Sequence, residues 1–260
     1  MNIDRLTLIS GRPIPCPGLR ASVYQPKLSE IALLGEREFY SYISVFKITA
    51  EDILNTLSGQ ELEAVKTQLS FYTDFQTILE MQRKDQRFEI GLTTILMMLL
   101  PQYNRIEYQE RFILMNTSPS DSQAKSKNAS LVIDDKKWTM LVEIASTIFC
   151  LDYSDSDEDT YNPASEEAKR IAEKLKKRHS LLNSQKNSNE DRKDILANLV
   201  SCLAVESKMS IEQVLDYTIY QFLNQVRRYN LQENYNNAIS SLLAGASKED
   251  VEIVDWRKEL

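Results

Sequence analysis

Glycine and proline are scarce in this chain, and their scarcity constrains the fold more than any other feature. The 260 residues include only 6 Gly and 7 Pro, against roughly 12% for the two together in average proteins. Both residues interrupt helices and mark tight turns. Five of the thirteen lie in one N-terminal stretch, Ser10–Gly18, so most of the remaining chain is free to form helices.

The Ser10–Gly18 stretch separates two short apolar segments, Ile3–Ile9 and Leu19–Tyr24. Turn residues between short apolar runs are typical of two strands joined by a loop, so a pair of N-terminal strands is expected. After Pro26 the apolar residues recur with helical spacing. This pattern predicts one helix from about Pro26 to Phe46.

Helix signals continue through the middle of the chain. Capping boxes at Thr49–Asp52 and Ser58–Glu61 predict two short helices. Two longer helices are expected over Phe71–Met81 and Phe88–Leu100, the second ending because Pro101 cannot continue it.

The apolar period then changes from helical to alternating. Ile106–Leu114 alternates, and Leu131–Ile133 follows a polar loop, which predicts a small hairpin. Helical spacing resumes at Trp138 and predicts a helix to about Leu151.

An acidic segment marks the expected domain boundary. Asp152–Asp159 holds five acidic residues and no aliphatic one, so it cannot bury itself in a core. We therefore expect an N-terminal α+β domain over residues 1–151, an acidic linker over 152–162 and a C-terminal helical domain over 163–260.

The C-terminal part is expected to be a helical bundle. The overall expectation is a mainly α fold with small β elements (α+β). One helix is expected to begin at Asn162–Pro163 and the last one at Ser247. Between them, helices are expected over Ile195–Ala204, over Ser210–Tyr229, which starts with a capping box, and over Leu231–Ala244, which ends before Gly245.

Residue patterns for catalysis or cofactor binding are absent from the sequence. His179 is the only histidine and stands at the end of a basic segment, where a solvated helix end is the simpler interpretation. The glycine spacings of the dinucleotide and phosphate loops do not occur. The odd number of cysteines, Cys16, Cys150 and Cys202, suits a reducing cytosol better than a disulfide framework or a zinc site. We predict no catalytic residues, cofactor or metal, although 38 acidic residues leave a carboxylate-dependent enzyme as an alternative.

One spacing resembles a calcium-binding loop. Asp155, Asp157, Asp159 and Glu166 occupy positions 1, 3, 5 and 12 of such a loop. Thr160 stands where the loop needs glycine, so an acidic linker is favoured over a metal site.

Charge and hydropathy limit the partners. With 31 basic and 38 acidic residues the net charge is −7, which argues against a surface that follows phosphates. Three tyrosines, Tyr217, Tyr220 and Tyr229, lie near Arg227 and Arg228 and could stack on bases. Packing within a helix explains their spacing more simply, so a nucleic-acid-binding adaptor stays an alternative.

The longest apolar run has six residues, too few to cross a membrane, and no secretory signal pattern is seen. A soluble, cytosolic protein is expected.

Several short stretches together have a recognisable pattern. They are Ser10-Gly-Arg-Pro-Ile-Pro15, Tyr24-Gln-Pro-Lys-Leu-Ser-Glu-Ile-Ala32, Gly35-Glu-Arg-Glu-Phe-Tyr40, Tyr161-Asn-Pro-Ala164, Ile171-Ala-Glu-Lys-Leu-Lys-Lys-Arg178, Tyr217-Thr-Ile-Tyr-Gln-Phe222 and Ala244-Gly-Ala246 before Trp256. Together they resemble proteins encoded among the tail genes of tailed bacteriophages. The C-terminal pattern, a tyrosine-rich helix, a second helix ending in Ala-Gly-Ala and a closing Asp-Trp, is similar to tail and baseplate assembly chaperones.

The resemblance implies a helical, non-enzymatic protein of the host cytoplasm or the virion. Its partners would be other phage tail or baseplate proteins, and it could form an oligomer. Aromatic anchors often dominate such interfaces. Tyr217, Tyr220 and Trp256 are therefore the candidate partner-binding residues, with closure of the C-terminal bundle as the alternative role. Phe222 and Leu223 are expected in the core.

Overall fold

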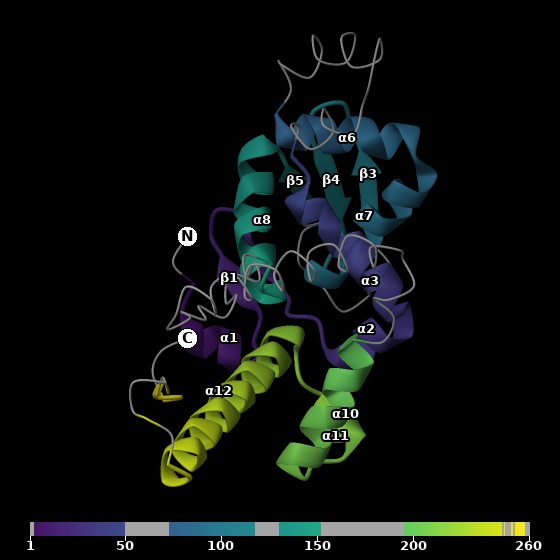
Figure 1. Cartoon of the computed structure of the whole chain (residues 1–260). Coiled ribbons are helices and arrows are strands. Elements are labelled where there is room, and N and C mark those ends of the chain that lie inside the picture. Colours follow the sequence, from purple (N-terminus) through teal and green to yellow (C-terminus); the bar gives the residue numbers. More distant parts are fainter. Residues whose placement is uncertain are drawn as a thin grey trace, which may run out of the picture.

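The computed structural model describes residues 3–49, 73–117, 130–151, 195–245, 247, 251 and 253–257. Within them the chain is mainly helical with two small antiparallel sheets (Figure 1), which confirms the expected α+β class. The expected helices at residues 49–52 and 58–61, the acidic linker with its calcium-like spacing, the helix at 162–163 and His179 lie outside the described residues.

The N-terminal segment begins with a helix where a strand was expected. Helix α1 spans Arg5–Ile9 because Asp4 caps it, its carboxylate accepting the Thr7 N–H at 2.9 Å. The expected strand pair is present, but its first strand lies inside the proline-rich stretch. Strand β1 spans Ile14–Cys16 and pairs antiparallel with β2, Ala21–Val23. Ile14 and Cys16 are buried, whereas Pro15 between them faces outward.

The single helix expected over residues 26–46 is divided. Helix α2 covers Leu28–Leu34, α3 covers Glu36–Ile43, and a 3-10 helix, η1, covers Ser44–Lys47. The break lies at Gly35, whose φ of 98° is outside the helical region and is accessible mainly to glycine.

The middle of the chain follows the expected order of helix, strand and helix. Helices α6, Asp74–Lys84, and α7, Gln86–Leu99, confirm the two expected helices, and α7 ends before Pro101. The expected hairpin has a third strand, because the segment after the polar loop joins the sheet in the order β3-β4-β5. The elements are β3 Arg105–Tyr108, β4 Ile113–Asn116, β5 Ser130–Ile133 and helix α8 Asp135–Phe149, which packs on β5.

The C-terminal helices begin at the expected caps but differ in where they stop. Helix α10 spans Ile195–Ser207, and α11, Ile211–Leu215, starts at the Ser210 capping box. The helix expected to continue to residue 229 instead stops after one turn. A second capping box, Thr218 with Gln221, starts the 25-residue helix α12, Ile219–Leu243, which includes the segment expected as a separate helix. The chain turns at Gly245 with a φ of 99°, and the described residues beyond it are not helical.

One buried cluster joins both ends of the chain. It includes side chains of α1, α2, α3, α6, α7, α8 and the strands, and also Leu196, Val200, Val214, Ile219 and Phe222 from the C-terminal helices. Helix α12 packs against α1 and α8. The elements before and after the expected linker therefore share a core, and the division into two domains stays a prediction.

Candidate partner-binding face of helix α12

The junction between α11 and α12 is fixed by backbone hydrogen bonds to the N-terminal part of the chain. The Leu28 N–H donates to the Tyr217 carbonyl at 2.9 Å, and the Ile219 N–H donates to the Pro26 carbonyl at 2.9 Å. Thr218 between them is buried and bridges to Lys27. These contacts set the direction in which α12 leaves the core.

Tyr217 and Tyr220 lie at this junction, and both side chains are half-buried against the core. The Tyr217 hydroxyl donates to the Met209 Sδ at 3.4 Å. Phe222, one turn further, is fully buried, which confirms its expected place in the core. Leu223 beside it is half-buried against the same cluster.

Trp256 belongs to the segment that follows α12, and it lies beside a later part of this helix than the two tyrosines do. The Arg228 guanidinium donates to the Trp256 carbonyl at 2.8 Å, and the Trp256 side chain is half-buried. Arg228 follows Tyr220 by eight residues, or about 12 Å along a helix axis. The structure thus places Tyr217 and Tyr220 together and Trp256 apart from them, and their binding to a partner stays a prediction.

The second half of α12 carries an apolar stripe that the core does not cover. We define the α12 stripe as Leu231, Tyr235, Ala238 and Leu242, spaced four, three and four residues apart, so they share one face of the helix. All four are half-buried, and most residues between them are exposed. Of the residues of α12, only Ile219 and Phe222 are buried. Figure 1 shows this half of α12 extending away from α8 and the three-stranded sheet.

Two contacts hold the first half of α12 to its neighbours. The Tyr229 hydroxyl donates a hydrogen bond to Glu206 of α10, which raises the pKa of Tyr229. Arg227 lies near Cys150, the residue that caps the C-terminus of α8. A positive charge at this position interacts favourably with the negative, C-terminal end of the α8 dipole. The two arginines considered for phosphate binding, Arg227 and Arg228, are therefore both engaged with protein groups.

The described residues offer little redox or metal chemistry. Among them, no three His, Cys, Asp or Glu side chains gather as metal ligands, and the cysteines are free thiols. Burial raises the pKa of Cys150 to about 11, although Arg227 acts in the opposite direction. That thiol is protonated at neutral pH and is a poor nucleophile.

Membrane insertion through a helix finds no support in the described part of the chain. None of its helices combines the length and the apolar composition needed to cross a bilayer.

The α12 stripe could have been found in the sequence, because its spacing is visible there. Residues 231–244 were expected to be a helix, and the four-three-four spacing marks one face of it. The sequence could not show that this face lies beyond the core.

The comparisons with known proteins point to the same part of the chain. Neither the curated proteins nor the solved structures give a match. A family model described as the YomV second domain matches residues 187–260, less than a third of the chain, and includes α10, α11, α12 and the C-terminal residues. That family is of phage type, from a Bacillus prophage. The C-terminal segment that carries the α12 stripe is therefore similar to a phage-associated domain.

Proposed function

We propose that this chain is a non-enzymatic phage protein that assists tail or baseplate assembly by binding another virion protein through the α12 stripe. It covers apolar surface of that partner until the partner is built into the particle, or it remains with the partner as a minor virion component. The binding energy comes from side chains on a helix face.

The observation that carries this proposal is the position of α12. Only Ile219 and Phe222 of this 25-residue helix are buried, and the partly buried side chains that pack on the core, Tyr220, Leu223 and Val226, all precede the stripe. An amphipathic helix with anchors spaced four, three and four residues apart suits a groove or helix face on a partner. The phage-type family match covers the whole of α12.

The composition of this half of α12 supports binding by apolar contact. Between Tyr229 and Leu243 the only charged residue is Glu233, in a chain with 27% charged residues. Charged residues are depleted and tyrosine is enriched at the centres of protein interfaces. Tyr235, in the middle of the stripe, is the best placed anchor.

The test is co-purification with tail and baseplate proteins of the same phage, expressed together with the tagged full chain. Leu242→Ser removes a stripe residue, and Leu243→Ser is its matched control, because Leu243 is 84% exposed and lies off the stripe. Loss of an interface anchor costs about 1–3 kcal/mol. We expect Tyr235→Ser and Leu242→Ser to weaken capture of a tail or baseplate protein by that amount, and Leu243→Ser to leave capture unchanged.

Two further variants test the aromatic residues that the sequence indicates as partner contacts. Tyr220→Ala and Trp256→Ala should preserve the helical circular dichroism spectrum and weaken capture by about 1–3 kcal/mol if these aromatic residues contact the partner. Wild-type capture by a folded double variant would remove them from the interface. Capture of replication proteins in place of tail proteins would contradict the assembly role, and mass spectrometry of purified particles distinguishes a chaperone from a virion component.

A further inference from the structure

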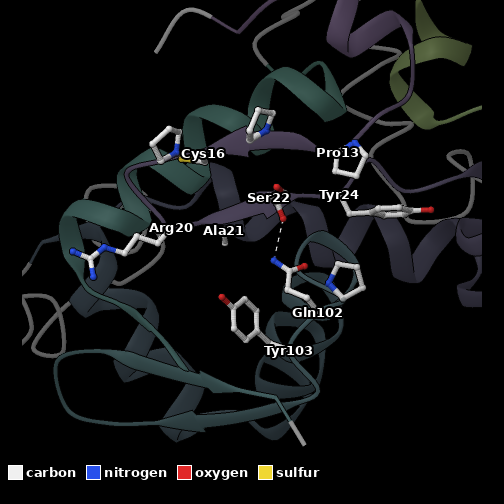
Figure 2. Close-up of a pocket in the computed structure, with 11 residues that line it drawn as sticks. Pro13, Cys16, Arg20, Ala21, Ser22, Tyr24, Gln102 and Tyr103 are labelled. Atoms are coloured by element: carbon white, nitrogen blue, oxygen red, sulfur yellow. Dashed lines mark hydrogen bonds between the residues drawn. The ribbon is translucent and has the colours of Figure 1, made fainter. Parts of the chain in front are cut away.

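A cavity of about 770 Å³ lies between the β1–β2 pair and the turn that follows α7. Figure 2 shows Arg20, Ala21, Ser22 and Tyr24 along β2 on one side and Tyr103 on the other. Its volume is within the range of roughly 300–1,000 Å³ typical of ligand sites. No residue of α12 lines this cavity, so it is separate from the α12 stripe.

Tyr103 provides a buried polar group that faces the cavity. The residue is only 5% exposed, and its hydroxyl points into the cavity in Figure 2. None of the described residues forms a hydrogen bond with this hydroxyl. Burial raises the pKa of Tyr103, so the hydroxyl remains protonated and can donate a hydrogen bond to a ligand.

The walls of the cavity exclude a ligand that adds a strand to the sheet. The Gln102 side chain already donates to the Ser22 carbonyl at 3.0 Å, and the Tyr24 N–H donates to the Leu99 carbonyl at 2.7 Å. Four prolines also line the cavity, and proline has no N–H to offer to a neighbouring strand. A ligand must therefore bind without a regular ladder of backbone hydrogen bonds.

A polyproline II segment meets this requirement. It forms no internal hydrogen bonds, its carbonyls are free to accept from side chains, and it binds grooves lined by aromatic residues. Tyr24 and Tyr103 with the four prolines supply such an apolar surface. The Tyr103 hydroxyl supplies a donor for one ligand carbonyl.

Arg20 sets the charge of the site. It is the one charged residue among those that line the cavity, and its side chain is exposed. Its backbone has a φ of 56°, which places it at a left-handed turn leading into β2. Within the described residues no ion pair is formed by Arg20, so its charge favours an acidic group on the ligand.

We propose that this cavity is a groove that binds an extended, proline-rich segment of a partner protein carrying an acidic residue. The ligand prolines pack on Tyr24 and the proline-lined wall, the Tyr103 hydroxyl donates to a ligand carbonyl, and Arg20 pairs with the ligand carboxylate. The groove goes beyond the proposed function because it is a second interaction surface that α12 does not form.

The probes are fluorescein-labelled decapeptides of proline pairs separated by leucine, one ending in aspartate and one in lysine, titrated into the full chain and followed by anisotropy. We expect saturable binding of the aspartate peptide and binding about two- to fivefold weaker for the lysine peptide, the scale of an exposed ion pair. This preference should shrink in 0.5 M salt. A peptide of valine and threonine with the same aspartate should not bind, because strand addition is blocked.

Variants then assign the contacts. Tyr103→Phe removes one hydrogen bond and should weaken both proline peptides about three- to tenfold. Arg20→Asn tolerates the positive φ and should make the two peptides bind alike, whereas Arg111→Asn, an exposed position outside the cavity, should leave the preference intact. Ser22→Trp fills the groove from an exposed position and should abolish binding even if Tyr103→Phe proves unstable.

Several results would overturn the groove. These are no saturable binding of either proline peptide, equal binding of the aspartate and lysine peptides to the wild type, tighter binding of the valine peptide, or insensitivity to Ser22→Trp. Tyr235→Ser in the α12 stripe should leave peptide binding unchanged. The failure of the groove is thus distinguishable from the failure of the proposed function, which is measured by capture of tail proteins.

Discussion

The carboxylate of Glu36 caps helix α10 by binding the N–H of Leu196, which lies 160 residues later in the chain. Its Oε1 accepts the N–H of Leu196 at 2.7 Å, and its Oε2 accepts the N–H of Ala197 at 3.3 Å. The first N–H groups of a helix have no partner within the helix, so a side chain or water must satisfy them. Glu36, in the first turn of α3, thereby ties α10 to the N-terminal part of the fold.

Replacing this carboxylate should destabilise the contact between the two segments. Glu36→Ala leaves the N–H groups of Leu196 and Ala197 without their acceptor, and we expect the free energy of unfolding to fall by about 1–2 kcal/mol. Urea unfolding measures it. Glu38→Ala is the control, because Glu38 is also in the first turn of α3. Equal losses in both variants would assign the effect to the α3 dipole alone.

Gly91 allows α3 and α7 to approach each other closely. A Cβ at Gly91 would lie 2.6 Å from the Cδ1 of Tyr42, which is too short for any real contact. Alanine is favoured over glycine in a helix by about 1 kcal/mol, but overpacking costs about 1–3 kcal/mol. We therefore expect Gly91→Ala to lower stability by roughly 1 kcal/mol in urea unfolding.

The same substitution should change sign when the ring is removed. In a Tyr42→Ala background the clash is absent, so Gly91→Ala should stabilise the protein by about 1 kcal/mol relative to Tyr42→Ala alone. A double-mutant cycle measures the coupling. A loss of the same size in both backgrounds would show that Tyr42 is not the obstacle.

Stability should decrease at high pH because of Tyr108. Burial raises its pKa to about 12, while its hydroxyl contacts the Thr93 Oγ1 at 2.7 Å. The Tyr108 hydroxyl ionises near pH 10 in the unfolded chain, before it does so in the folded protein. Its contribution to the free energy of unfolding is therefore complete below pH 10 and is lost between about pH 10 and 12. The loss is roughly 2 kcal/mol. Urea midpoints at pH 8 and pH 11 should differ less for Tyr108→Phe than for the wild type, and an unchanged difference would contradict the assignment.

The cysteines should differ in their reaction with a thiol reagent. Cys202 is exposed on α10, Cys16 is buried, and burial raises the pKa of Cys150 to about 11. Because the thiolate is the reactive form, we expect DTNB at pH 8 to modify one thiol quickly in the folded chain. Cys202→Ser should abolish that fast phase. A fast phase that persists in Cys202→Ser would show that one of the other two thiols is accessible.

Features that depend on neighbours in the sequence were predictable. The capping box at Ser210, the end of α7 before Pro101 and the turn at Gly245 follow from interactions within a few residues of each position. The α+β class followed for the same reason, since the apolar period changes from helical to alternating and back along the chain.

Features that depend on distant residues were decided only by the tertiary structure. Helix α11 stops before residue 217 because backbone groups of residues 217 and 219 pair with those of residues 26 and 28. The proline-lined groove exists because the turn after α7 packs beside β2, about 80 positions away in the chain. Periodicity shows which side chains share a face, but it does not show what covers that face. The sequence therefore determined where most helical segments and several of their caps lie, while the packing of distant segments decided that the α12 stripe lies outside the core.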